Sequence, residues 1–200
     1  MTDPGQPTGT DMTDPTGPAA TEPEETPALA VIPEQAPEAQ LATPPIRARV
    51  VVASNRASAG VYADTSGPFI AERLADLGCA VDDPVVVPDG QPVAEALLAA
   101  VQDGVDVVIT SGGTGVNPSD RTPEMTRAVI DYEIPGIAEA IRAYGAPTVP
   151  TAILSRGVAG VAGRMLVVNL PGSRGGAKDG MAVLAPVLVH TVDQLRGGDH

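Results

Sequence analysis

A glycine-rich segment of this 200-residue chain has the composition of an anion-binding loop. Residues 110–115 read Thr-Ser-Gly-Gly-Thr-Gly, directly after a run of apolar residues. Glycines let the main chain approach a ligand closely, and successive amides with nearby hydroxyls can surround a phosphate. No Gly-Lys-Ser/Thr follows, so the segment is not a Walker A loop, and its glycines do not have the spacing of a GxGxxG motif. The pattern indicates a phosphate cradle, although a plain glycine turn has the same composition.

Two aspartates follow predicted strands and could act beside such a cradle. Asp120 directly precedes a predicted helix, for which Thr122 offers an N-cap and Pro123 a first helical residue. An acid there can simply interact with the helix dipole, or it can hold Mg²⁺ or orient a substrate. Asp89 lies in Val-Pro-Asp-Gly, where Asp-Gly is also a common turn. The structural and the chemical role stay open for both residues.

A second glycine-rich loop covers residues 169–176, with the sequence Asn-Leu-Pro-Gly-Ser-Arg-Gly-Gly. Ser173 and the neighbouring amides precede the last predicted helix, and a helix N-terminus attracts anions. We expect Arg174 and Lys178 to add positive charge nearby. A glycine-rich turn with an N-cap serine is the simpler alternative. Two such loops at one edge of a sheet predict a ligand with more than one phosphate.

The elements that must position these loops alternate along the chain from Ile46 onward. Apolar runs predict strands over 47–54, 85–87, 105–111, 148–154 and 165–170. Helical spacing predicts helices over about 69–78, 93–104, 134–145 and 177–195, besides the one that starts near residue 122. This alternation predicts an α/β fold, namely a three-layer α/β/α domain with a mainly parallel sheet. Ligands of such sheets bind beyond the carboxyl ends of the strands, where both glycine loops fall.

The first 45 residues differ in composition from the rest. They carry ten of the 21 prolines and eight acids, but no Lys or Arg, and we predict a disordered tail over 1–45. The remainder has 17 acids against 12 basic residues, which argues against nucleic acid or an anionic membrane as the main partner.

Cys79, the only cysteine, is expected to be buried and reduced. Since no signal peptide or membrane span is evident in the sequence, we expect a cytoplasmic protein.

Taken together, the short motifs resemble the molybdopterin adenylyltransferases, the Mog-type proteins of molybdenum cofactor biosynthesis. The resemblance covers about residues 47–196, with the segments in the family's order and spacing. The matching segments are 55–62 with 66–68, 87–89, 111–115 with 120–124, 134–136, 154–156 and 169–173.

The resemblance implies that residues 46–200 form a molybdopterin-binding domain of a homotrimer. Such a protein uses Mg²⁺ and ATP to adenylylate the terminal phosphate of molybdopterin, releases pyrophosphate, and can partner a molybdenum insertase. The resemblance also implies that Asp89 and Asp120 are needed for turnover, and that either could bind Mg²⁺. The residues it places against substrate or nucleotide are Ser54, Ser58, Ser111, Gly112, Gly113, Thr114, Gly115, Ser155, Pro171, Gly172 and Ser173.

Two positions depart from the family pattern. Asn55 stands where the family often has aspartate, and Gly90 stands where a second acid often follows the first. Neither change affects Asp89 or Asp120, so we expect an active enzyme. Because both substrates are anionic and the attacking phosphate oxygen is already ionised, electrostatics should dominate over proton transfer. Two alternatives remain: a paralogue that binds molybdopterin without adenylylating it, and a trimeric scaffold that recruits cofactor enzymes through its acidic tails.

Overall fold

The computed structural model describes residues 44–61 and 63–198. The tail predicted over 1–45 lies, apart from its last two residues, outside this part of the chain. The strands form one seven-stranded sheet in the order β2-β1-β4-β7-β6-β5, with β3 also paired to β1. The strands are β1 (Arg47–Ala53), β2 (Ala80–Val81), β3 (Val85–Val87), β4 (Val107–Ser111), β5 (Tyr132–Glu133), β6 (Ala159–Ala162) and β7 (Met165–Leu170). The helices are α1 (Asn55–Ser58), α2 (Ser66–Asp76), α3 (Gln91–Gln102), α4 (Thr122–Arg127), α5 (Pro135–Gly145), the 3₁₀ helix η1 (Pro150–Leu154) and α6 (Arg174–Arg196).

The sheet is mainly parallel, as the alternation of strands and helices predicts. β1 pairs in parallel with β2, β3 and β4, and β4 pairs in parallel with β7, whereas β6 and β5 add antiparallel pairs. At the carboxyl end of β4, Ser111 pairs with Val52 on one side and with Leu170 on the other. These strands therefore end nearly level, and the loops that follow them leave from one edge of the sheet.

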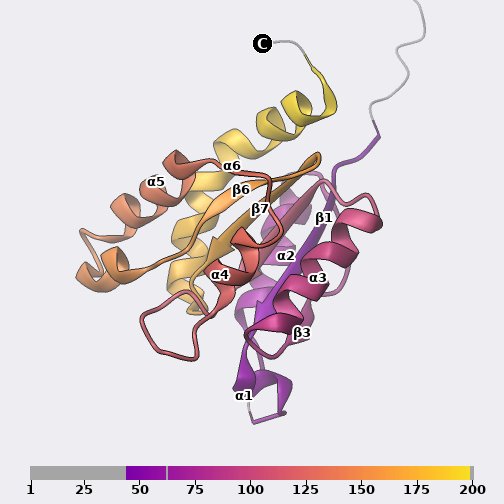
Figure 1. The fold of residues 1–200 in the computed structure, drawn as a ribbon. Coiled ribbons are helices and arrows are strands. Elements are labelled where there is room, and N and C mark those ends of the chain that lie inside the picture. Colours follow the sequence, from indigo (N-terminus) through magenta and orange to yellow (C-terminus); the bar gives the residue numbers. More distant parts are fainter. Residues whose placement is uncertain (1–43, 62, 199–200) are drawn as a thin grey trace, which may run out of the picture. The chain divides into compact units, whose positions relative to one another are not determined.

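Helices cover both faces of the sheet. Val50 and Val52 of β1 belong to one hydrophobic cluster and Val51 to another, because successive strand residues point to opposite faces. The first cluster includes side chains of α2, α5 and α6, and the second includes side chains of α3 and α4. The ribbon shows the sheet between these helical layers (Figure 1). The predicted three-layer α/β/α fold is confirmed.

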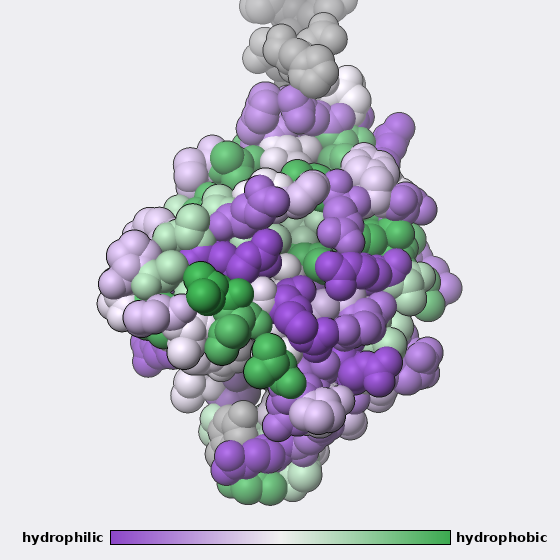
Figure 2. Space-filling model, turned by 60° about the vertical axis from the view of Figure 1, so that its left-hand side comes forward, coloured by the Kyte–Doolittle hydropathy of each residue, from purple (hydrophilic) through white to green (hydrophobic). Residues whose placement is uncertain are grey.

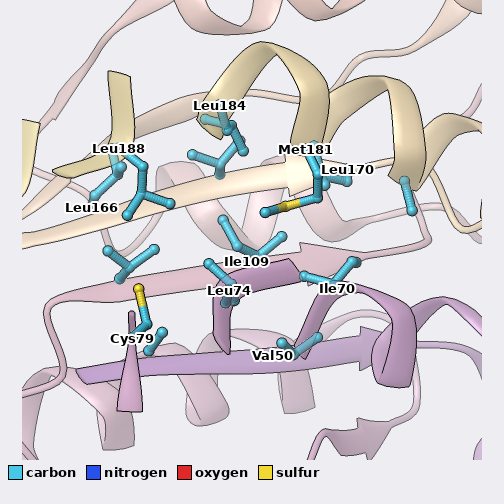
Figure 3. Packing of buried hydrophobic residues seen from close by; sticks show 14 of the residues in the cluster. Val50, Ile70, Leu74, Cys79, Ile109, Leu166, Leu170, Met181, Leu184 and Leu188 are labelled. Atoms are coloured by element: carbon cyan, nitrogen blue, oxygen red, sulfur yellow. The ribbon is translucent and has the colours of Figure 1, made fainter. Parts of the chain in front are cut away.

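The larger cluster packs aliphatic side chains from the helices against the central strands. Leu74 of α2 and Leu184 and Leu188 of α6 are fully buried there (Figure 3). Cys79 lies in the same cluster as a free thiol, only 8% exposed. Burial, together with the nearby negative charge of Asp106, raises the pKa of this thiol. The prediction of a buried cysteine is confirmed, and its reduced state stays a prediction.

The strand predicted over 148–154 is wrong, because this segment forms η1. Pro150 has no amide hydrogen to donate in a sheet. Two amides of the segment instead donate to carbonyls three residues earlier, at 2.8 and 3.1 Å, which is the 3₁₀ pattern. Ile153 and Leu154, which favoured the strand prediction, are consequently exposed.

β5 and β6 were not predicted, because their composition does not favour strands. β6 consists of Ala-Gly-Val-Ala, and β5 has only two residues. A side chain at Gly160 would come within 2.5 Å of Ile130 and of the carbonyl of Tyr132. The close pairing of β5 with β6 therefore requires glycine at this position, although glycine lowers the apparent strand propensity.

The last helix, α6, begins slightly earlier than its apolar pattern predicts. Ser173 caps it, since its Oγ accepts a hydrogen bond from the amide of Gly176 at 3.1 Å. Pro186 lies inside this 23-residue helix and removes one backbone donor, as expected. Among the residues that the structure describes, no helix combines the length and apolarity needed to cross a membrane.

The last turn of α6 is tied to the beginning of β1 by Arg196. Its guanidinium donates to both carboxylate oxygens of Asp106 at 3.0 and 2.8 Å, and to the carbonyls of Pro44 and Pro45. Asp106 also accepts from the amide of Arg47 at 2.8 Å. Burial alone would raise the pKa of Asp106, but the hydrogen bonds from Arg196 and Arg47 hold it below its ordinary value.

Replacing Arg196 with Met should lower the free energy of unfolding by about 1–3 kcal/mol near neutral pH, because Asp106 loses two charge-assisted hydrogen bonds. A carboxylate whose pKa is lowered by folding stabilises the protein above its unfolded-state pKa of about 4, and loses that effect as the pH falls further. Urea denaturation should therefore show the difference between wild type and Arg196→Met shrinking below about pH 4.

Arg127→Met provides the control for this prediction. Arg127 forms an ion pair of 2.7 Å with Glu133, but both side chains are 40% exposed or more. Its loss should lower the free energy of unfolding by no more than about 1 kcal/mol. Equal losses in the two variants, or a difference that does not depend on pH, would contradict the assigned role of Arg196.

Candidate functional site

One cavity lies at the edge where the parallel strands end. Its volume is about 620 Å³, and it is bordered by the loops after β1, β3, β4 and β7, by the start of α2 and by η1. In Figure 1 this is the end of the sheet at which α1 follows β1. Ligands of parallel α/β sheets bind at this position, so we take the cavity as the candidate site.

The cavity brings together almost every residue that the sequence analysis places in the site. The exception is Ser58, which is exposed in α1, where its hydroxyl donates to the carbonyl of Asn55 at 3.2 Å. The predicted residues that line the cavity are Ser54, Asp89, Ser111, Gly112, Gly113, Thr114, Gly115, Asp120, Ser155, Pro171, Gly172 and Ser173.

The first glycine loop needs glycine for its conformation and for close contacts. Gly112 and Gly113 have φ values of 99° and 62°, which side chains disfavour. A Cβ atom would also overlap the carbonyl of Ala53 at the first position and the carboxylate of Asp89 at the second. The amides of Gly113, Thr114 and Gly115 donate no hydrogen bond within the described residues. These amides are thus available to a ligand that accepts hydrogen bonds.

This loop is closed at its base by one backbone hydrogen bond. The amide of Thr122 donates to the carbonyl of Gly113 at 3.1 Å. Between these residues Val116, Pro118 and Ser119 are exposed, whereas Thr114 is buried. The loop therefore has a fixed base at the cavity and an exposed tip.

The second glycine loop lies against the first. A Cβ atom at Gly172 would lie only 3.0 Å from the Cα of Gly112, so the two loops touch through glycine. The amides of Gly172 and Ser173 also donate no hydrogen bond within the described part of the chain. Two sets of available amides therefore border one cavity, which suits a ligand, or a pair of ligands, with several anionic groups.

Asp89 caps α4 from a different loop. Its carboxylate accepts hydrogen bonds from the amides of Gly90 at 2.7 Å and Arg121 at 3.2 Å, and from the hydroxyl of Thr122 at 3.3 Å. The side-chain oxygen of Asn55 in turn accepts a hydrogen bond from the amide of Asp89 at 3.0 Å. The sequence analysis expected Thr122 to cap α4, but the cap residue is Arg121 and the capping carboxylate comes from Asp89. Asp89 thereby fixes the first glycine loop relative to β3.

Asp120 differs from Asp89, because its carboxylate accepts no hydrogen bond from the described residues. Only its main chain is held locally, by a bond from its amide to the carbonyl of Asn117 at 2.8 Å. A carboxylate that borders the cavity without a donor of its own is available to a cation or to a substrate.

Positive charge is placed differently from the expectation. Neither Arg174 nor Lys178 lines the cavity, and the guanidinium of Arg174 lies 5.7 Å from the ring centre of Phe69. Among the residues that line the cavity, Arg56 is the one with a cationic side chain. It belongs to α1, directly after β1.

Asp64 and Ser66 were not predicted, although both line the cavity. Ser66 donates from its hydroxyl to Asp64 at 2.7 Å, and Ser111 donates to the hydroxyl of Ser66 at 2.9 Å. Asp64 also accepts the amide of Gly67 at 2.7 Å and so caps the start of α2. An Asp two residues before a serine at a helix start was the available signal, but helix capping alone explains it.

The rim of the cavity on the η1 side is apolar. Val149 and Leu154 line the cavity, although both side chains are about half exposed. The face shown in Figure 2 likewise carries a compact hydrophobic band beside strongly hydrophilic surface. The site thus combines polar loops with an apolar border, which fits a ligand that has both anionic and ring-like parts.

Comparison with known proteins places this chain and its fold in a family. Residues 49–190 match the family model described as a probable molybdopterin binding domain. A molybdenum cofactor biosynthesis bifunctional protein from Chlorobaculum tepidum is 36% identical over 77% of this chain and 50% of its own length. This chain thus spans about half the length of that relative.

Shorter relatives match over most of their length. A molybdopterin adenylyltransferase from Helicobacter pylori is 37% identical over 74% of this chain and 86% of its own. The solved structure of the molybdopterin biosynthesis Mog protein from Mycobacterium ulcerans is 52% identical, with a TM-score of 0.74 over 78% of this chain and 99% of its own. These matches confirm the resemblance predicted from the motifs. The chain belongs to the family of the probable molybdopterin binding domain.

Proposed function

We propose that this chain transfers the adenylyl group of ATP to the terminal phosphate of molybdopterin, giving adenylylated molybdopterin and pyrophosphate. The observation that carries this proposal is the contact between two loops with available amides at one cavity, because two anionic substrates must be held side by side. The relatives named molybdopterin adenylyltransferase support the same reaction.

In this reaction an oxygen of the molybdopterin phosphate forms a bond to the α-phosphorus of ATP, and the bond to the leaving pyrophosphate breaks. The attacking oxygen is already ionised near neutral pH, so no side chain has to remove a proton. The chain must instead position the two substrates and compensate for their negative charge. The amides of residues 113–115 and 172–173 are suited to both tasks.

Asp120 is the residue that we expect to hold Mg²⁺. Magnesium commonly binds through one or two carboxylates together with substrate phosphates. The described residues contain no cluster of three or more His, Cys, Asp or Glu side chains that could hold a metal by itself. A single carboxylate without a hydrogen-bond donor fits an ion that is largely held by the nucleotide. When bound, the ion would neutralise charge on the triphosphate.

Asp89 has a different place in this proposal. Its carboxylate oxygens already accept hydrogen bonds from two amides and one hydroxyl, so a cation would have to compete with these donors. We therefore assign to Asp89 the positioning of the first glycine loop and α4. The sequence alone could not separate the two aspartates.

The decisive experiment measures pyrophosphate release from ATP with and without molybdopterin, together with the adenylylated product. Release that depends on molybdopterin supports the proposed reaction. Binding of molybdopterin without release would indicate a non-catalytic paralogue, and neither binding nor release would favour the scaffold.

Substituting Asp120 with Asn should reduce turnover at least ~100-fold, which corresponds to about 2.7 kcal/mol of lost transition-state stabilisation. Stability should change by less than about 1 kcal/mol, because the carboxylate holds no other residue in place. Binding of molybdopterin, measured by titration, should persist. Asp83→Asn, at an exposed position outside the cavity, is the matched control and should retain full turnover. Unchanged turnover in Asp120→Asn would contradict the assignment.

Arg56→Gln should raise the KM for ATP about tenfold, because the cavity loses its cationic side chain and the triphosphate is anionic. Arg174→Gln is the control and should change KM less than about twofold, since its guanidinium lies over Phe69 and not at the cavity. Steady-state kinetics at fixed ionic strength measures both. A larger effect at Arg174 than at Arg56 would reverse this assignment.

We also propose the homotrimer that the resemblance implies. Several apolar side chains of one chain are exposed, including Tyr144 and Ile153, which are 56% and 66% accessible. Light scattering should give a mass near three times the 20.2 kDa of one chain. A monomer or dimer mass would refute the trimer. A molybdenum insertase as partner and a cytoplasmic location stay predictions.

A further inference from the structure

Arg156, between η1 and β6, contacts the first glycine loop at three points along its length. Its Nε donates to the carbonyl of Gly115 at 2.7 Å, and its Nη2 donates to the carbonyl of Asp120 at 2.6 Å. Its own amide donates to the carbonyl of Thr114 at 2.8 Å. One residue therefore holds both sides of the loop between β4 and α4.

A fourth contact joins Arg156 to α4. Its Nη1 donates to a carboxylate oxygen of Glu124, in the first turn of the helix. This hydrogen bond from Arg156 lowers the pKa of the Glu124 carboxyl, against the opposing effect of burial. The other oxygen of Glu124 is buried and has no partner among the described residues. Arg156 thus makes the largest contribution to the compensation of the Glu124 charge, with a smaller one from Arg121.

The geometry of these contacts is specific for a guanidinium. Its planar fork presents N–H groups in several directions, so that one side chain reaches two carbonyls and a carboxylate at once. A lysine ammonium at the same position could replace only part of this set. The contacts also leave Arg156 outside the lining of the main cavity; it instead borders a second hollow of about 340 Å³.

These contacts bear on Asp120 in particular. Its carboxylate borders the cavity without a hydrogen-bond donor, and Asn117 and Ser119, which precede it, are exposed. Asp120 is held through its main chain. Its amide donates to the carbonyl of Asn117, and its carbonyl accepts a hydrogen bond from the guanidinium of Arg156. Of these two anchors, Arg156 is the one outside the loop, and it holds the carbonyl of the same peptide unit whose amide, that of Arg121, donates to Asp89.

We propose that Arg156 is a positioning residue, which holds the Asp120 carboxylate at the cavity without touching the substrate. This inference rests on the proposed function, in which Asp120 holds Mg²⁺ at the nucleotide. It predicts that Arg156 acts on turnover and on the dependence on Mg²⁺ rather than on the affinity for molybdopterin.

The test compares Arg156→Met, Arg156→Lys and Arg142→Met in the full chain. Arg142 is the matched control, because it donates to the carbonyls of Ser155 and Gly157 on either side of Arg156 but to no residue of the glycine loop. For Arg156→Met we expect kcat to fall at least about tenfold, and half-maximal rate to require at least about threefold more Mg²⁺. The affinity for molybdopterin should stay within about twofold of wild type. Arg156→Lys should recover part of the kcat, and Arg142→Met should retain the wild-type dependence on Mg²⁺.

Hydrogen exchange of the segment 113–121 gives a readout that does not require activity. Its amides should exchange faster in Arg156→Met than in Arg142→Met, while the core strands stay protected. If the wild type forms no pyrophosphate, the proposed function fails, but faster exchange would still support the positioning role. Wild-type kcat and Mg²⁺ dependence in Arg156→Met, or equal changes in Arg142→Met, would overturn it. If Arg156→Met does not fold, Arg156→Lys decides by the same measurements.

Discussion

The level ends of β1, β4 and β7 are the constraint on which the site depends. Because Val52, Ser111 and Leu170 share one register, the loops that follow them leave the sheet at one height and meet. The contact between Gly112 and Gly172 leaves no room for a side chain, and a Cβ atom at Gly112 would also overlap the carbonyl of Ala53. The amides of both loops can then face one cavity, which a slip in strand register would prevent.

The three aspartates at the cavity are used in two ways. Asp64 and Asp89 accept hydrogen bonds at the starts of α2 and α4, where a carboxylate compensates unpaired amides. Asp120 accepts none. Their formal charges are equal, yet only one of them is available to a cation without breaking protein contacts. Residue type and spacing indicate Asp89 and Asp120 as acids that follow strands and leave Asp64 unnoticed, but partner atoms decide what each one does.

Much of the fold and of the cavity was predictable from local patterns. Apolar runs located β1, β4 and β7, and glycine-rich segments located the loops after β4 and β7, because these signals are contained within a few residues. Interactions between segments far apart in sequence were not predictable: Asp89 caps α4 from 32 residues away, and Arg156 reaches Gly115 from 41 residues away. The wrong strand prediction over 148–154 has the same origin, because its apolar residues favour a strand but no strand of the described sheet pairs with this segment.

The hydrogen bond between the amide of Thr122 and the carbonyl of Gly113 separates the base of the first glycine loop from its tip. The entropy lost on closing a loop grows only slowly with its length, so added residues at an exposed tip change the stability little once the base is formed. Residues 116–119 can therefore differ in length or sequence between relatives while the amides at the base keep their places. Such changes at the tip leave in place the glycines whose positive φ values shape the wall of the cavity.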